Sequence, residues 1–127
     1  MAHATDDFVG KPKRSEIPQF CGKCHSNKQK MRPYGLPADQ VELYWSSWHG
    51  KALKKGNISV AVCIDCHGKG HKIVSHKDTS SPVYVKNIPH TCGRCHSDRE
   101  LMESVKISPS VVEDYLASVH ARAIYEK

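Results

Sequence analysis

The sequence predicts a mainly α-helical chain with extensive loops and little or no sheet. Near the C-terminus apolar residues recur at helical spacing, at Val112, Leu116, Val119 and Ala123. Glycine, serine and proline are concentrated over residues 68–91, which predicts loop there. The hydrophobic fraction is 39% and the mean hydropathy is −0.55, so a core built from side chains alone would be thin. At 127 residues, the chain has the length of a single domain spanning residues 1–127.

Two segments carry the helical pattern, and we expect helices over residues 38–55 and 109–125. In the second helix, Ser108 is a suitable N-cap and Pro109 fits the first helical position. The short stretch 83–85, Val-Tyr-Val, is compatible with a strand but does not require one.

The pattern Cys-x-x-Cys-His occurs three times and uses every cysteine of the chain. Two thiols at this spacing can add to the vinyl groups along one edge of a porphyrin, and the next histidine can then bind the iron. The pattern therefore predicts three c-type haems, with iron as the metal, and we expect each copy to open a short helix. Attachment is assigned to Cys21, Cys24, Cys63, Cys66, Cys92 and Cys95, and proximal ligation to His25, His67 and His96.

Zinc and disulfides are the competing interpretations of these cysteines. A structural zinc site usually takes two such pairs, and three pairs do not divide evenly into four-cysteine sites. Disulfides are compatible with an exported protein. Neither alternative explains a histidine directly after every second cysteine, so haem is favoured.

Three haems would change both the core and the charge of the protein. With about 42 residues per haem, the cofactors would form the core, and the apoprotein would be largely unfolded. The polypeptide has a formal charge of +6. The haem propionates reduce this value to about +3 to 0, so the basic composition does not predict a nucleic-acid partner.

The sequence contains no apolar run of 18 residues, so no transmembrane segment is expected. Ala2-His3-Ala4 has the small-x-small character of a signal-cleavage site, without the apolar stretch that would precede one. Haem is attached to cysteine outside the cytoplasm. We therefore expect an exported protein in the periplasm, outside the cell or at its surface.

An internal repeat with an offset of 71 residues relates residues 21–56 to residues 92–127. In both copies 24 residues separate the proximal histidine from a downstream histidine, His49 in the first and His120 in the second. The middle segment, 57–91, carries the second haem motif and has no second copy. The order is therefore A, B, A′.

The repeat makes His49 and His120 the best candidates for distal iron ligands, and His71 comes next. His71 cannot bind the same iron as His67, because four residues span at most about 14 Å and the path around the ring is about 20 Å. It would serve a neighbouring haem. His76 and His90 are more typical of surface histidines, and His3 is close to the chain terminus.

Met31 and Met102 are also equivalent in the repeat. A methionine thioether can be an axial ligand that raises the reduction potential. Packing against haem is the more common use of methionine.

Three stretches resemble those of multihaem c-type cytochromes. They are residues 44–53 (YWSSWHGKAL), 61–73 (AVCIDCHGKGHKI) and 87–96 (NIPHTCGRCH). The resemblance implies closely stacked haems with histidine on both faces and a role in electron transfer, and it supports His49, His71 and His120 as distal ligands. Some members of this group form extracellular haem filaments. The chain differs from the pattern at Ala121, where a glycine usually follows the histidine.

Electron transfer through three bis-histidine haems is the favoured function, with redox proteins or further copies of the chain as partners. Irons without an open position do not readily bind a substrate, so we expect no enzyme activity. The alternative is an enzyme or gas sensor with one five-coordinate haem. The sequence contains no glycine-rich phosphate loop and no identifiable serine triad.

Overall fold

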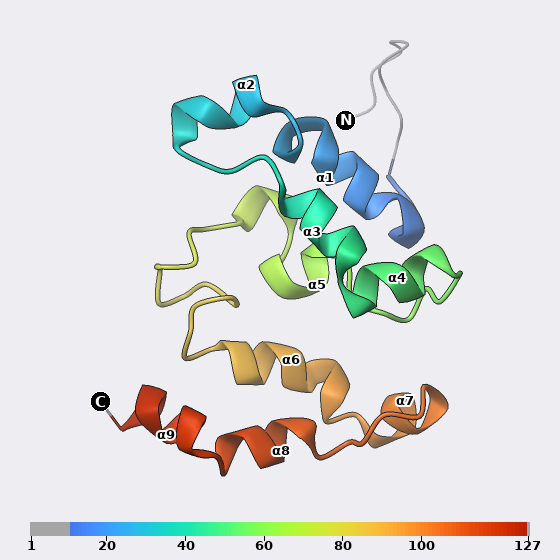
Figure 1. Ribbon diagram of the computed structural model, residues 1–127, viewed down its shortest axis with the longest axis vertical. Helices are drawn as coiled ribbons and strands as arrows, with labels where there is room; N and C mark the ends of the chain where they lie inside the picture. The colour runs from blue at the N-terminus through green and yellow to red at the C-terminus, as the bar shows by residue number, and fades with distance from the viewer. Residues whose placement is uncertain (1–10, 127) are drawn as a thin grey trace. The chain divides into compact units, whose positions relative to one another are not determined.

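The computed structural model describes residues 11–126, except for the side chain of His71, and is about 59% helical (Figure 1). No strand occurs among these described residues, which confirms the mainly α-helical fold with extensive loops. The chain divides into two compact units, residues 1–65 and 66–127. His3 lies outside the described residues.

In the first unit, 3-10 turns occur at η1 (Arg14–Glu16) and η2 (Arg32–Tyr34). The helices are α1 (Ile17–His25), α2 (Lys28–Met31), α3 (Gln40–Ser46) and α4 (Trp48–Lys54). Helix α1 packs against α3, and α3 packs against α4. The boundary between the units falls within α5 (Cys63–His67).

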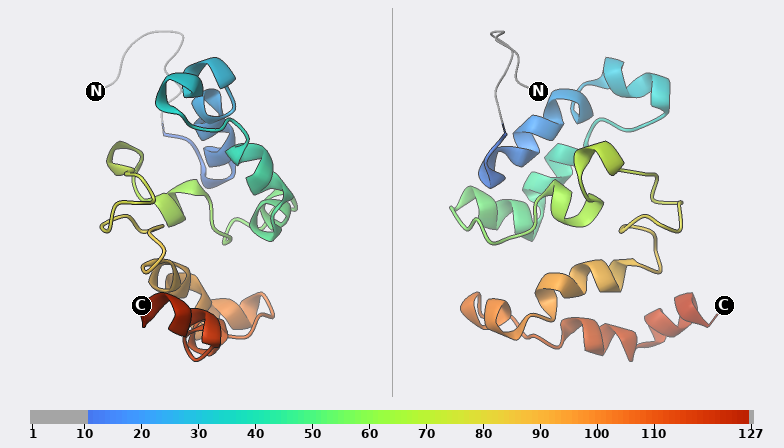
Figure 2. Two further views of the ribbon diagram at one scale, coloured as in Figure 1. Left: turned by 60° about the vertical axis from the view of Figure 1, so that its left-hand side comes forward. Right: turned by 180° about the vertical axis from the view of Figure 1, so that it is seen from behind.

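The second unit begins with a 3-10 turn, η3 (Gly70–Lys72). Its helices are α6 (Ile88–His96), α7 (Arg99–Ser104), α8 (Val111–Leu116) and α9 (Val119–Tyr125). Helices α8 and α9 follow α6 along one side in every view (Figures 1 and 2).

The helix boundaries recur at the offset of the sequence repeat. Both ends of α6 lie 71 residues after those of α1, and the same is true of α9 and α4. The first residues of α7 and α8 lie 71 after those of α2 and α3. Caps recur as well, because the side chains of Asn27 and Asp98 each accept a hydrogen bond from the third following N–H, both at 3.1 Å.

The expected continuous helices over 38–55 and 109–125 are each broken in two, which corrects the sequence prediction. At the first break, Ser47 has extended backbone angles (φ −79°, ψ 165°). Its Oγ donates to the carbonyl of Tyr44 (2.5 Å) and accepts from the N–H of Gly50 (3.1 Å). One hydroxyl thus satisfies the end of α3 and the start of α4, which makes the break stable.

Ser118 repeats this break between α8 and α9, with φ −83° and ψ 163°. Helix α8 also begins later than predicted, at Val111, with Ser110 as its N-cap. The reason is local, since Ser108 Oγ accepts a hydrogen bond from the N–H of Ser110 (3.2 Å) and holds a turn where the helix was expected.

The haem motifs do not all open helices as predicted. Only the second one does, since α5 begins at Cys63. The first and third motifs close α1 and α6. Pro18 and Pro89 stand in the first turn of these helices, where a missing N–H costs nothing, so each helix begins a turn before its first cysteine.

Residues 73–87 are a chain of turns, and 83–85 form no strand. The Asn87 amide donates to the carbonyls of Thr79 (2.8 Å) and Ser81 (2.9 Å), and the Thr91 hydroxyl donates to that of Pro82 (2.6 Å). The Ser80 side chain and N–H both donate to Asp78, which lowers the pKa of that carboxyl. This segment is therefore ordered by side-chain hydrogen bonds rather than by regular structure.

The protein core is small, as the composition predicts. In the first unit, the buried apolar cluster consists of Ile17, Leu53 and Val62. Among the described residues of the second unit, the buried apolar ones are Pro89, Met102 and Ala121. Large apolar side chains such as Trp48 (86% exposed) remain in contact with solvent. The chain thus leaves apolar area that a bound group would have to cover.

Gly50 makes the sharp turn from α3 to α4 sterically feasible. A Cβ at this position would overlap the carbonyl oxygen of Tyr44 and lie 2.7 Å from the Cα of Trp45. The equivalent residue is Ala121, which is buried but accommodated. There, the N–H to Ser118 Oγ distance is 3.4 Å, against 3.1 Å at Gly50, and α8 ends earlier, at Leu116. The second turn is therefore slightly more open.

We expect Gly50→Ala to destabilise the haem-loaded protein by about 1–3 kcal/mol, because α4 must move away from α3. The matched control is Ala121→Gly, which removes a methyl group and should cost about 1 kcal/mol. Guanidinium titration followed by far-ultraviolet circular dichroism measures both. If Gly50→Ala lowered the free energy of unfolding by no more than Ala121→Gly does, the steric argument would be contradicted.

Candidate haem-attachment sites

Each Cys-x-x-Cys-His motif is helical through its histidine, in α1, α5 and α6. In a helix, positions i, i+3 and i+4 lie on one face, so two thiols and one imidazole share that face at every site. No disulfide joins any of the six cysteines, all of which lie in the described part of the chain. Two thiols beside one imidazole on a helix face suit covalent attachment of haem with a nitrogen ligand to its iron.

The first and third motifs have glycine as their second residue. Side chains of neighbouring residues lie close to where a Cβ would be. A Cβ on Gly22 would lie 3.3 Å from Ser26 Oγ and 3.4 Å from a methyl group of Val41 on α3. On Gly93 the corresponding distances are 3.4 Å to Ser97 Oγ and 3.8 Å to Val112 on α8. A Cβ at Gly22 would thus be tight against Ser26, whereas a Cβ at Gly93 would meet its neighbours at ordinary van der Waals distances.

The second motif is held by its aspartate. Asp65 Oδ2 accepts a hydrogen bond from the N–H of Val62 (2.8 Å), which caps the start of α5. The Arg14 guanidinium binds both carboxylate oxygens of Asp65, at 2.6 and 3.3 Å. It also donates to the carbonyls of Ile58 (3.0 Å) and Val60 (2.9 Å). One arginine thus fixes the whole segment that leads into Cys63.

The first two attachment points meet at one apolar cluster. Cys21 and Cys63 are both half-buried and both pack against the cluster formed by Ile17, Leu53 and Val62. Tyr44 joins them there, with its hydroxyl donating to the carbonyl of Ala61 (2.7 Å). Forty-two residues separate these cysteines in the sequence, and the fold of the first unit brings them together.

The candidate distal histidines occupy equivalent positions in the repeat. His49 and His120 are each the second residue of a helix, α4 and α9, and both side chains are exposed. The serine caps at 47 and 118 set the same backbone geometry before each of them. His71 lies in η3, and its side chain is outside the described part of the structure. His76 and His90 are exposed.

Over the described residues, no three histidine, cysteine or acidic side chains converge on a common metal position. The pairing of distal and proximal histidines stays a prediction from the sequence. Met31 (6% exposed) and Met102 (4%) are buried within their units, which fits packing better than ligation.

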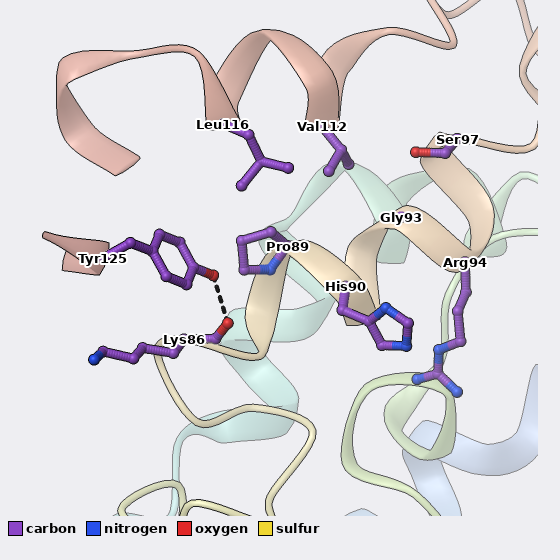
Figure 3. A pocket seen from close by; sticks show the side chains of 9 residues that line it. All are labelled: Lys86, Pro89, His90, Gly93, Arg94, Ser97, Val112, Leu116 and Tyr125. Atoms are coloured by element: carbon purple, nitrogen blue, oxygen red, sulfur yellow. Dashed lines mark hydrogen bonds between the residues drawn. The ribbon is translucent and has the colours of Figure 1, made fainter. Parts of the chain in front are cut away.

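The structure also contains an open pocket of about 500 Å³ in the second unit, which the sequence did not indicate (Figure 3). Pro89 and Gly93 on α6, with Ser97 at the C-cap of this helix, face Val112 and Leu116 on α8 across it. Gly93 and Arg94, the two middle residues of the third Cys-x-x-Cys-His motif, are among the residues that line it. The pocket therefore borders this motif.

Among the differences between the repeats at this pocket, one reduces the size of a side chain. Leu116 stands where the first repeat has Trp45, which packs against the apolar cluster and has Lys54 Nζ 5.8 Å from its ring. The smaller side chain leaves the space open. The signal in the sequence was the Trp-to-Leu change between aligned repeat positions.

Three helical Cys-x-x-Cys-His motifs on a scaffold with little buried apolar surface are typical of the class of c-type cytochromes. The comparison with known proteins supports this class. The chain is similar to the cytochrome c-type protein NrfB of Haemophilus influenzae, with 27% identity over 103 residues. The match includes 68% of this chain and 46% of that protein, so the chain spans less than half of the relative's length. No protein-family model and no solved structure matches the chain.

The similarity supports a c-type cytochrome with haem iron. Within the described residues, no helix has the length and apolar character needed to cross a membrane.

We expect Arg14→Ala to loosen the segment before Cys63 and to lower the free energy of unfolding by about 1–2 kcal/mol, because three hydrogen-bonded partners lose their donor. The salt bridge to Asp65 adds little, since both side chains are partly exposed (41% and 32%). Guanidinium titration of the haem-loaded protein, followed by the Soret band, measures the change.

Arg32→Ala is the matched control, because it removes an exposed arginine of the same unit. It should change the unfolding free energy by less than about 0.5 kcal/mol. If the two variants were equally stable, Arg14 would have no special structural role.

Proposed function

We propose that this protein transfers electrons through three closely spaced c-type haems, each with histidine on both faces of its ring. The observation that carries this proposal is the packing of Cys21 and Cys63 against one apolar cluster. Because these two cysteines belong to different motifs, they would tether two haems at neighbouring points. When bound, haem iron supplies a one-electron carrier that cycles between the ferric and ferrous states.

The six cysteines would hold the groups, and His25, His67 and His96 would be the proximal ligands. His49, His71 and His120 would be the distal ligands. His71 cannot reach around the ring attached beside His67, so it would bind the iron of a neighbouring haem. That arrangement also favours short distances between haems, as does the shared cluster.

The residues between the motifs would serve to position the groups and to exclude water. Leu53 and Val62, which are 4% and 1% exposed, form an apolar surface shielded from solvent between the first two attachment points. Exposed apolar side chains, among them Trp48 beside His49, would pack on porphyrin faces. A low local polarity tunes the potential of such centres, together with their axial ligands.

The partners are proposed to be redox proteins or further copies of the chain, in the periplasm or outside the cell. Head-to-tail contacts between copies that do not close would form a filament. Size-exclusion chromatography of concentrated protein tests assembly, since a strict monomer is incompatible with it. Electron transfer itself does not require assembly.

Intact mass and low-temperature EPR test the haem count and the ligation. We expect a mass increase equal to three haems and an oxidised spectrum in which all irons are low-spin. A high-spin signal in the untreated protein, or carbon monoxide binding after reduction, would instead favour an enzyme or gas sensor with one open iron. Colourless, correctly matured protein would contradict haem attachment altogether.

Single substitutions test the distal ligands. His49→Ala and His120→Ala should each convert one of three irons to high spin and allow about one carbon monoxide per protein to bind. His90→Ala is the control, because His90 is an exposed histidine on α6 that we assign no ligation. A fully low-spin spectrum in either of the first two variants would remove that histidine from the ligand set.

A further inference from the structure

We propose that the second repeat presents a docking face for a non-helical apolar segment of a partner cytochrome chain. The face consists of Ile88, Cys92, Tyr115, Leu116 and Ile124, and we call it the open face. This inference rests on the proposed function, since the docked segment would bring a further haem to the third one. It follows from comparing two copies of one structural unit within the same chain.

In the first repeat, the equivalent face is covered. Residues 58–63 lie on it, and Val60, Val62 and Cys63 pack with Ile17 and Leu53. Ile17 is 8% exposed as a result, and Leu53 is 4% exposed. The segment is not helical before Cys63, and its carbonyls are bound by side chains of the repeat, from Tyr44 to Ala61 and from Arg14 to Ile58 and Val60.

In the second repeat, no described segment of the second unit covers the corresponding residues. Ile88, the equivalent of Ile17, is 42% exposed, and Leu116 is 50% exposed. Cys92 is exposed, whereas Cys21 is half-buried. The Tyr115 hydroxyl, equivalent to that of Tyr44, makes no hydrogen bond within the described residues. The face therefore keeps the apolar surface and the donor that hold a segment in the first repeat.

The differences between the two faces indicate which side chains the bound segment would have. Val85, which is 47% exposed, replaces Arg14. Without a guanidinium, the occupant needs no aspartate equivalent to Asp65. Val85 and Ile88 also line a hollow of about 330 Å³, together with Val83, Tyr84, His76 and Lys77. Branched aliphatic side chains at alternate positions fit this hollow, with one carbonyl placed to accept from Tyr115.

The occupant is assigned to a different chain, because residues 58–63 of this protein are already held on the first repeat. Intramolecular tethering favours that arrangement over exchange between copies. In the first repeat the covering segment leads directly into Cys63, beside Cys21. A segment docked in the same way would bring a partner's first haem cysteine beside Cys92. The open face would thus be the place where electrons leave or enter this protein.

The test uses the haem-loaded full chain and a synthetic peptide of residues 57–65 with Cys63 replaced by serine. The peptide carries a fluorophore at its N-terminus, and binding brings the fluorophore near haem, which quenches it. A scrambled peptide of the same composition is the first control. We expect saturable quenching by the native order and at least tenfold weaker binding of the scrambled peptide.

Three variants locate the binding. Ile88→Asp should weaken peptide binding at least tenfold, and Tyr115→Phe about fivefold, because one hydrogen bond is lost. Ile107→Asp is the matched control, since Ile107 is 43% exposed in the same unit but lies outside the face. It should bind the peptide as the unaltered protein does.

Equal binding by Ile88→Asp and Ile107→Asp, or equal affinity for the native and scrambled peptides, would overturn the proposal. Dimers that Ile88→Asp abolishes would overturn the choice of a different chain as occupant. Haem count and spin state are measured on the same samples. A protein with three low-spin haems and no peptide binding would refute the docking face alone, and a wrong haem count would refute the proposed function.

Discussion

Each proposed haem site requires two thiols and an imidazole to face the same ring, and the rest of the structure depends on this constraint. A helical turn satisfies it, because positions i, i+3 and i+4 share a face. Helices α3 and α8 pack beside two of these turns, with Val41 next to Gly22 and Val112 next to Gly93. The protein therefore arranges its helices around attachment points rather than around a large apolar core.

The sequence was sufficient to predict the helical class, the three motifs and the repeat, because these depend on spacing alone. It was not sufficient to predict where the long helices break. Apolar periodicity continues through Ser47 and Ser118, and the break is caused by a hydroxyl that caps two helix ends at once. A serine cap of this kind is favoured over a continuous helix only when the second helix can pack against another element of the fold. That condition is tertiary, and no local pattern reports it.

The contacts around Asp65 were also beyond sequence reasoning. An aspartate within a haem motif suggests at most a cap at a helix start, which it is. Its second partner, Arg14, lies 51 residues away, and nothing in either residue indicates the pairing. The shared cluster of Cys21 and Cys63 is similar in kind. Spacing identified the cysteines, and only the fold of the first unit shows that two motifs meet.

The two repeats share helices but differ in how firmly they would hold a covering segment. The first uses a guanidinium that binds two carbonyls and a carboxylate, which suits a permanent contact within one chain. The second has Val85 in that place and retains only the tyrosine hydroxyl. Among related complexes, differences in affinity come mainly from the dissociation rate. An interface with apolar contacts and few polar ones therefore releases its partner faster than one that also has a guanidinium. An electron carrier must release each partner after transfer, so the weaker face is the one suited to exchange between proteins.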